Sequence, residues 1–119
     1  MSEGFSFENL NVYQKALNFA NIIYSVTDKF PKEERFVLID QFRRAAISIS
    51  LNIAEGHGAS DPELRRYLRI ARGSVRECVA LIAISELKRY INYAEGKKLR
   101  DSCIEISKML AGLIKVTSP

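Results

Sequence analysis

The sequence contains no tryptophan, a single histidine, His57, and only two cysteines among 119 residues. With one histidine, a single chain cannot build a multi-histidine metal site or a relay of two histidines. Carboxylate-bridged di-iron bundles need a Glu-x-x-His motif on two helices, so they are excluded for the same reason. We therefore expect no metal ion and no cofactor.

The chain also lacks a phosphate-binding loop, a membrane span and a recognisable leader. Gly56-His57-Gly58 is not a Walker A loop, because no predicted strand precedes it and the required Lys and Ser/Thr are missing. The longest nearly uncharged stretch, residues 45–54, is far shorter than the roughly 20 apolar residues that cross a bilayer. The N-terminus has no basic, apolar segment typical of a signal peptide. These absences predict a cytoplasmic protein without a membrane anchor.

The composition is that of one ordinary globular domain. Hydrophobic residues make up 47% and charged residues 27% of the chain, so we predict a single domain over residues 1–119. Cys78 and Cys103 both fall inside apolar helical patterns, and we expect reduced, buried thiols. The net charge of +4 is compatible with a polyanionic partner but does not establish one.

Proline and glycine divide the chain into four segments in which apolar residues recur at helical spacing. We predict helices over about residues 9–28, 35–56, 62–90 and 93–116. Asp61 is a candidate N-cap before Pro62, and Asn92 is a candidate cap for the last helix. Because the connections are short, the predicted fold is all-α, an antiparallel up-down-up-down four-helix bundle.

Each segment carries an apolar stripe that predicts its core face. The predicted core positions are Leu10, Tyr13, Leu17, Ala20, Tyr24 and Thr27; Ile39, Phe42, Ala46, Ile49 and Ile53; Leu64, Leu68, Ala71, Val75, Cys78 and Ile82; and Leu99, Cys103, Ile106, Leu110 and Leu113. Further apolar residues lie off these stripes: Ile22, Ile23, Phe36, Val37, Ile47, Leu51, Leu81 and Ile84. A lone bundle needs one apolar face per helix, so this surplus predicts a homo-oligomer that covers it.

Three polar residues, Ser48, Asn52 and Glu55, share one face of the second predicted helix, and we call them the polar seam. Polar groups in an apolar run must face solvent or find partners. The favoured interpretation is a structural, hydrogen-bonded contact with another helix or subunit. The alternative is a ligand-binding or catalytic role.

The third predicted helix carries Arg65, Arg69, Arg72 and Arg76 at steps of four, three and four, which we call the arginine row. These positions are the core stripe displaced by one residue, so the guanidinium groups flank the core like the edge positions of a heptad. Four arginines on one edge repel one another unless carboxylates or phosphates neutralise them. Two interpretations stay open: pairing with acids elsewhere in an oligomer, and a phosphate-binding surface, where Arg is preferred over Lys.

Three stretches resemble a known four-helix-bundle family, the one named for the 23S rRNA intervening sequence protein: FENLNVYQKAL, FPKEERFVLIDQFRRAAISISLNIAEGHG and LRRYLRIARGSVRECVALI. That family is similar to the accessory variability protein of diversity-generating retroelements, a barrel-like homopentamer whose basic surface engages a reverse transcriptase and nucleic acid. The resemblance implies a homopentamer. It also implies a nucleic-acid-binding role for Arg43, Arg44, Arg65, Arg66, Arg69, Arg72 and Arg76.

Together these observations predict a non-enzymatic, homo-oligomeric adaptor that binds RNA or DNA, or a nucleoprotein containing a reverse transcriptase, through arginine-rich helix faces. One alternative is a protein–protein interaction module that binds no nucleic acid. The least favoured alternative is an enzyme that uses the polar seam, because the chain offers no nucleophile–base pair.

Overall fold

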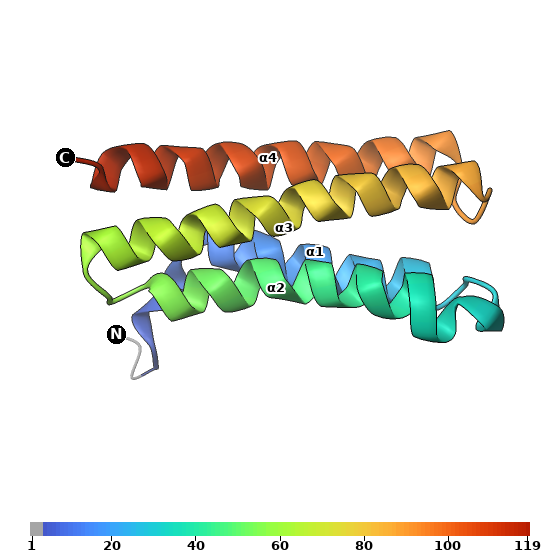
Figure 1. Ribbon diagram of the computed structural model, residues 1–119, viewed down its shortest axis with the longest axis horizontal. Helices are drawn as coiled ribbons and strands as arrows, with labels where there is room; N and C mark the ends of the chain where they lie inside the picture. Colours follow the sequence, from blue (N-terminus) through green and yellow to red (C-terminus); the bar gives the residue numbers. More distant parts are fainter. Residues whose placement is uncertain (1–3) are drawn as a thin grey trace.

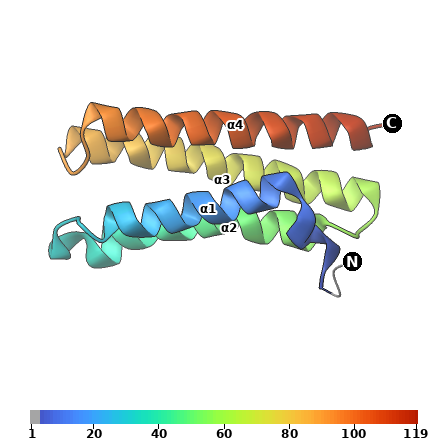
Figure 2. The same cartoon turned by 180° about the vertical axis from the view of Figure 1, so that it is seen from behind.

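Four long helices carry the chain in the computed structural model, which describes residues 4–119 (Figure 1). Each helix runs opposite to the one before it, so the start of α1 and the end of α4 lie at the same end of the bundle (Figure 2). The predicted all-α four-helix bundle is confirmed. The long helices are α1 (Asn11–Thr27), α2 (Asp40–Gly56), α3 (Asp61–Leu87) and α4 (Tyr93–Thr117), and three short turns precede α1 and α2: η1 (Ser6–Asn9), η2 (Lys32–Glu34) and the π-helical η3 (Arg35–Ile39).

Of the two helix N-caps predicted from the sequence, one is confirmed and one is corrected. Asn92 caps α4 as predicted, and a capping box with Glu95 satisfies two backbone N–H groups at 2.8 and 2.9 Å. The predicted cap at Asp61 is wrong by one residue, because the Ser60 hydroxyl accepts the hydrogen bond from the backbone N–H of Glu63. Asp61 instead lies in the first turn of α3, where its carboxylate faces the positive end of the helix.

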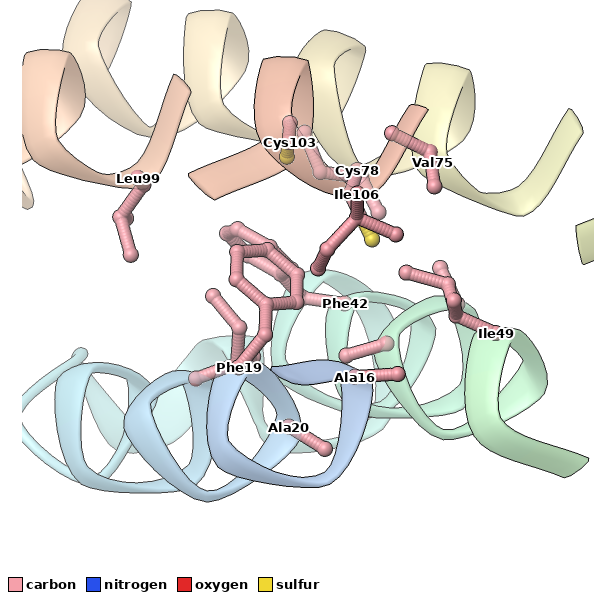
Figure 3. Close-up of a cluster of buried hydrophobic side chains, with 14 of the residues drawn as sticks. Ala16, Phe19, Ala20, Phe42, Ile49, Val75, Cys78, Leu99, Cys103 and Ile106 are labelled. Atoms are coloured by element: carbon pink, nitrogen blue, oxygen red, sulfur yellow. The ribbon is translucent and has the colours of Figure 1, made fainter. Parts of the chain in front are cut away.

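One continuous apolar core runs along the bundle. Phe19 of α1 and Phe42 of α2 project toward Cys78 of α3 and toward Cys103 and Ile106 of α4 (Figure 3). Both cysteines are free and buried, as predicted, and burial raises the pKa of the Cys103 thiol to about 12 and raises that of Cys78 as well. The thiols therefore stay protonated and act as small apolar side chains.

The predicted core face is confirmed in α2 and, apart from the half-buried Leu64 and Leu113, in α3 and α4. In α1 it is only partly right: Ala20 and Thr27 are buried, but Leu17 and Tyr24 are 41% exposed. Two stripes with the same spacing compete in this helix. The stripe with Phe19 wins because it buries a large side chain without a polar group, whereas a buried Tyr24 hydroxyl would need a partner. The buried residues of α1 are Val12, Ala16, Phe19, Ala20, Ile23 and Thr27.

The surplus of apolar residues is accordingly smaller than predicted. Ile23 and Leu81 belong to the core, and Ile47 is half-buried. Five of the eight residues remain exposed: Ile22, Phe36, Val37, Leu51 and Ile84.

Replacing Ile49 by alanine should lower the free energy of unfolding by about 2–4 kcal/mol, because this fully buried side chain would leave a cavity in the core. Asn11 is exposed, and Asn11→Ala should cost about 0.5 kcal/mol or less. Urea unfolding of both variants measures the difference. Equal shifts of the two midpoints would contradict this assignment of the core.

Candidate nucleic-acid interface

Two of the three polar-seam residues bond to each other and tie α2 to α3. The Asn52 amide donates to the backbone carbonyl of Ser48 at 2.8 Å and to its hydroxyl at 3.1 Å. Ser74 of α3, which sequence reasoning missed, donates its hydroxyl to Ser48 Oγ at 2.9 Å. Ser74 directly precedes the core residue Val75, and this adjacency is the signal that could have found it. Glu55 lies on the exposed face and bonds to neither of the other two within residues 4–119.

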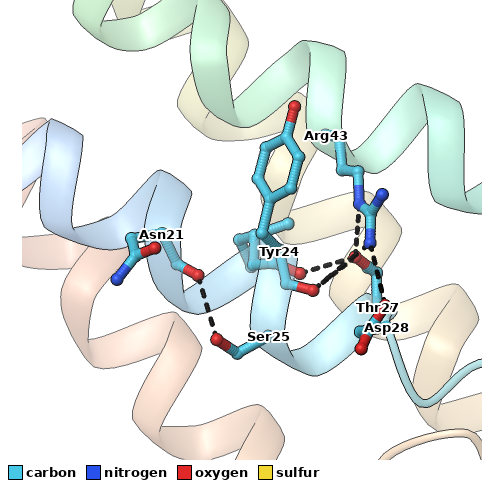
Figure 4. Close-up of polar contacts among 7 residues, drawn as sticks. Asn21, Tyr24, Ser25, Thr27, Asp28 and Arg43 are labelled. Carbon is cyan, nitrogen blue, oxygen red and sulfur yellow. Dashed lines mark hydrogen bonds and ion pairs between the residues drawn. The ribbon is translucent and has the colours of Figure 1, made fainter.

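Arg43 braces the end of α1 (Figure 4). Its Nε donates to Thr27 Oγ1 at 2.9 Å and its Nη2 to the Tyr24 carbonyl at 3.3 Å, and the guanidinium lies 4.5 Å from the centre of the Tyr24 ring. A cation beside the last carbonyls of a helix is favourable, because they carry the negative end of the helix dipole. Two of the five N–H donors of Arg43 are therefore used inside the fold, and its guanidinium is held against the end of α1.

Arg44 and Arg66 pair with acids of their own helices. Arg44 Nε lies 3.1 Å from Asp40 Oδ2, and Arg66 Nη2 lies 3.3 Å from Glu63 Oε2. The hydrogen bond from Arg66 to Glu63 raises the pKa of the Arg66 guanidinium. Both pairs are on the surface, where exchange with another anion costs little.

The arginine row divides into one engaged and three unpaired residues. Arg65 Nη1 donates to the backbone carbonyl of Thr117, in the last turn of α4. Arg69, Arg72 and Arg76 make no ion pair with any acidic side chain in the described residues 4–119. The Nε atom of Arg72 is buried and has no hydrogen-bond partner there. A buried donor without an acceptor is costly, so an outward shift of the Arg72 side chain that brings this nitrogen to an anion would be favourable.

At the other end of the α3–α4 pair, the acids are already occupied. Two guanidinium nitrogens of Arg100 donate to the Glu86 carboxylate at 2.8 and 2.6 Å, and this hydrogen bonding lowers the pKa of Glu86. The carboxylate occupies the space beside Gly96, so a Cβ atom at that position would displace it from Arg100. Asp101 pairs with Lys97 at 3.2 Å. Neither acid is left over to neutralise the arginine row.

Other kinds of site find little support. Within residues 4–119, no three His, Cys, Asp or Glu side chains gather closely enough to hold a metal ion. No helix in the described part of the chain is both long enough and apolar enough to cross a membrane. A hollow of about 660 Å³ lies at the α3–α4 turn and is lined by Glu86, Tyr90 and Tyr93 among others. Its lining residues do not form the nucleophile–base pair that a catalytic site would need.

Comparisons with known proteins agree with the fold. The family model described as 23S rRNA-intervening sequence protein matches residues 8–112. A crystal structure of a protein with unknown function from the S23 ribosomal protein family of Bacteroides thetaiotaomicron is 27% identical, with a TM-score of 0.80 over 87% of this chain and 95% of that chain. No curated protein matches the chain. Neither description names a catalytic activity, and the similarity to the accessory variability protein stays a prediction.

The Glu86–Arg100 pair should stabilise the protein in a pH-dependent way. Because the folded pKa of Glu86 is lowered, the contribution is complete above the unfolded glutamate pKa of about 4.3 and is lost as the pH falls through the folded value. Glu86→Gln mimics the protonated carboxyl. Thermal unfolding should therefore show a gap between wild type and Glu86→Gln at pH 7 that closes at acid pH, and a constant gap down to pH 3 would refute this role.

Proposed function

The chain belongs to the 23S rRNA-intervening sequence protein family, and from that premise we propose that it is a non-enzymatic, homo-oligomeric adaptor that binds RNA or DNA through the arginine-rich face of α3. One observation carries the proposal. Arg69, Arg72 and Arg76 have no acidic partner among residues 4–119. Unpaired guanidinium groups in a row repel one another, and they form no ion pair that would stabilise the monomer. Such a row therefore points to a partner outside the monomer.

Electrostatics makes phosphate the preferred partner of the arginine row. The row runs from Arg65 to Arg76, eleven helical steps or about 16 Å, so neighbouring charges lie close enough to repel one another. Phosphates relieve this repulsion, and the planar guanidinium group binds their oxygens with two parallel hydrogen bonds. A nucleic-acid strand supplies such groups at regular intervals.

The seven arginines implied by the family resemblance then divide into different roles. We assign the main phosphate contacts to Arg69, Arg72 and Arg76. Arg43 and Arg65 are held by the ends of α1 and α4, and their role is to brace the fold. Arg44 and Arg66 can add contacts by releasing their surface carboxylates.

The second part of the proposal is a closed ring of five chains. Val37 of η3 and Leu51 of α2 are 64% and 61% exposed, and Ile70 and Ile84 of α3 are half exposed. On α3, Ile70 and Ile84 lie about 100° around the helix from the arginine row. A second copy packed on this α2–α3 face would cover apolar surface and leave the row open, and a head-to-tail contact with a closing rotation forms a ring.

Light scattering on the purified protein should give a mass of about five times the 13.5 kDa of one chain. Val37→Glu should reduce the mass without loss of helicity, because it places a charge in the proposed interface. Val116→Glu is the matched control, since Val116 is 82% exposed and lies in α4, outside that face. A wild-type monomer at micromolar concentration would end the ring proposal.

Binding to RNA should weaken steeply as salt rises, because each phosphate contact releases counterions, and it should show little sequence preference. Changing Arg69 and Arg72 together to Glu should abolish binding while helicity and oligomer mass stay unchanged. Fluorescence anisotropy with a labelled RNA measures both effects.

The control is the double charge reversal of Lys97 and Lys98, at the start of α4. If both pairs of substitutions cost the same affinity, general basic character rather than the arginine row explains the binding. If the wild type binds no RNA at roughly 50 mM salt, the chain is a protein–protein interaction module instead.

A further inference from the structure

Helices α3 and α4 lie side by side and antiparallel along their length (Figures 1 and 2). Two contacts fix their alignment: Arg65 bonds to Thr117 near one end, and Glu86 pairs with Arg100 near the other. Between these two points, each step forward along α3 corresponds to about one step back along α4. Arg76 is therefore level with Lys108, and Arg69 is level with the last turns of α4, where Lys115 lies.

The two lysines lie on the exposed side of α4, next to the edge that faces α3. Arg100 marks the edge of α4 that faces α3, because its guanidinium reaches Glu86. At 100° per residue, Lys108 and Lys115 lie about 80° and 60° further around the helix, away from the core residues Leu99 and Cys103. Both lysines are exposed, and within residues 4–119 neither has an acidic partner.

We propose that the furrow between α3 and α4 holds one single-stranded nucleic-acid backbone, with the arginine row as one wall and Lys108 and Lys115 as the other. This inference rests on the proposed function and names its ligand more closely. Packed helices lie about 8–10 Å apart, so long basic side chains from both walls converge on phosphates in the furrow. Ala111 is exposed on α4 opposite Arg72, and because its side chain is small it does not fill the furrow.

The shape of the furrow favours a single strand over a duplex. The arginine row runs along the axis of α3 for about 16 Å, and Lys108 and Lys115 cover about 10 Å along α4. A duplex backbone winds away from a straight furrow after a few phosphates, whereas a flexible single strand can follow it throughout. Arg72 is half-buried, and its buried Nε, without an acceptor in the described residues, would gain one if the side chain shifted outward to a phosphate in the furrow.

The test compares a single-stranded oligonucleotide with its duplex, titrated by anisotropy across a range of salt. The single strand should bind more tightly. Lys108→Gln combined with Lys115→Gln should reduce the slope of log K against log salt by about 1.4, or 0.7 for each lost phosphate contact. Lys97→Gln combined with Lys98→Gln, on the same helix but beyond the furrow, should leave the slope nearly unchanged.

The failures of the two proposals can be told apart. If the Lys108 and Lys115 substitutions leave the slope unchanged while reversal of Arg69 and Arg72 abolishes binding, the furrow is wrong and the proposed function stands. Equal or tighter binding of the duplex overturns the single-strand assignment. Absence of binding to either oligonucleotide at roughly 50 mM salt overturns both proposals.

Discussion

Burial of the apolar stripe of α3 sets the rotation of that helix, and the position of every charged group discussed above depends on it. Leu68, Ala71 and Val75 are fully or almost fully buried. Once they face the core, residues one step further along the chain must flank it, toward α4 and solvent. The arginine row is therefore placed by hydrophobic packing, and its electrostatic repulsion is a consequence that the fold tolerates.

Charge is distributed unevenly along the α3–α4 pair. At the turn between the two helices, Glu86 and Asp101 neutralise Arg100 and Lys97. At the opposite end, Arg65 reaches a backbone carbonyl, and the remaining members of the row meet no acid in the described residues. The proposed binding of a polyanion rests on these unpaired members of the row rather than on the net charge of +4.

The sequence was sufficient for the four helices and for most of the core, because apolar spacing in α2, α3 and α4 allows one dominant face. It was insufficient in α1, where two stripes compete and only the packing of Phe19 decides between them. The sequence placed Ser74 beside the core, but its contact with Ser48 depends on how α2 and α3 are aligned, which spacing within one helix does not give. The proposed role of the α4 lysines depends in the same way on the alignment of α4 with α3. Charge spacing located the arginine row but could not tell the engaged Arg65 from the unpaired Arg72.

The most direct test of the account follows the arginine Nε–H signals by NMR while a single-stranded oligonucleotide is added. The signals of Arg69, Arg72 and Arg76 should shift, with that of Arg72 among the largest, because a phosphate that draws its side chain outward gives the buried Nε its first acceptor. The signal of Arg43, whose Nε is bonded to Thr27, should stay in place. Shifts confined to Arg43, or an unchanged Arg72 signal at saturating oligonucleotide, would contradict the central claim that the arginine row of α3 binds phosphates.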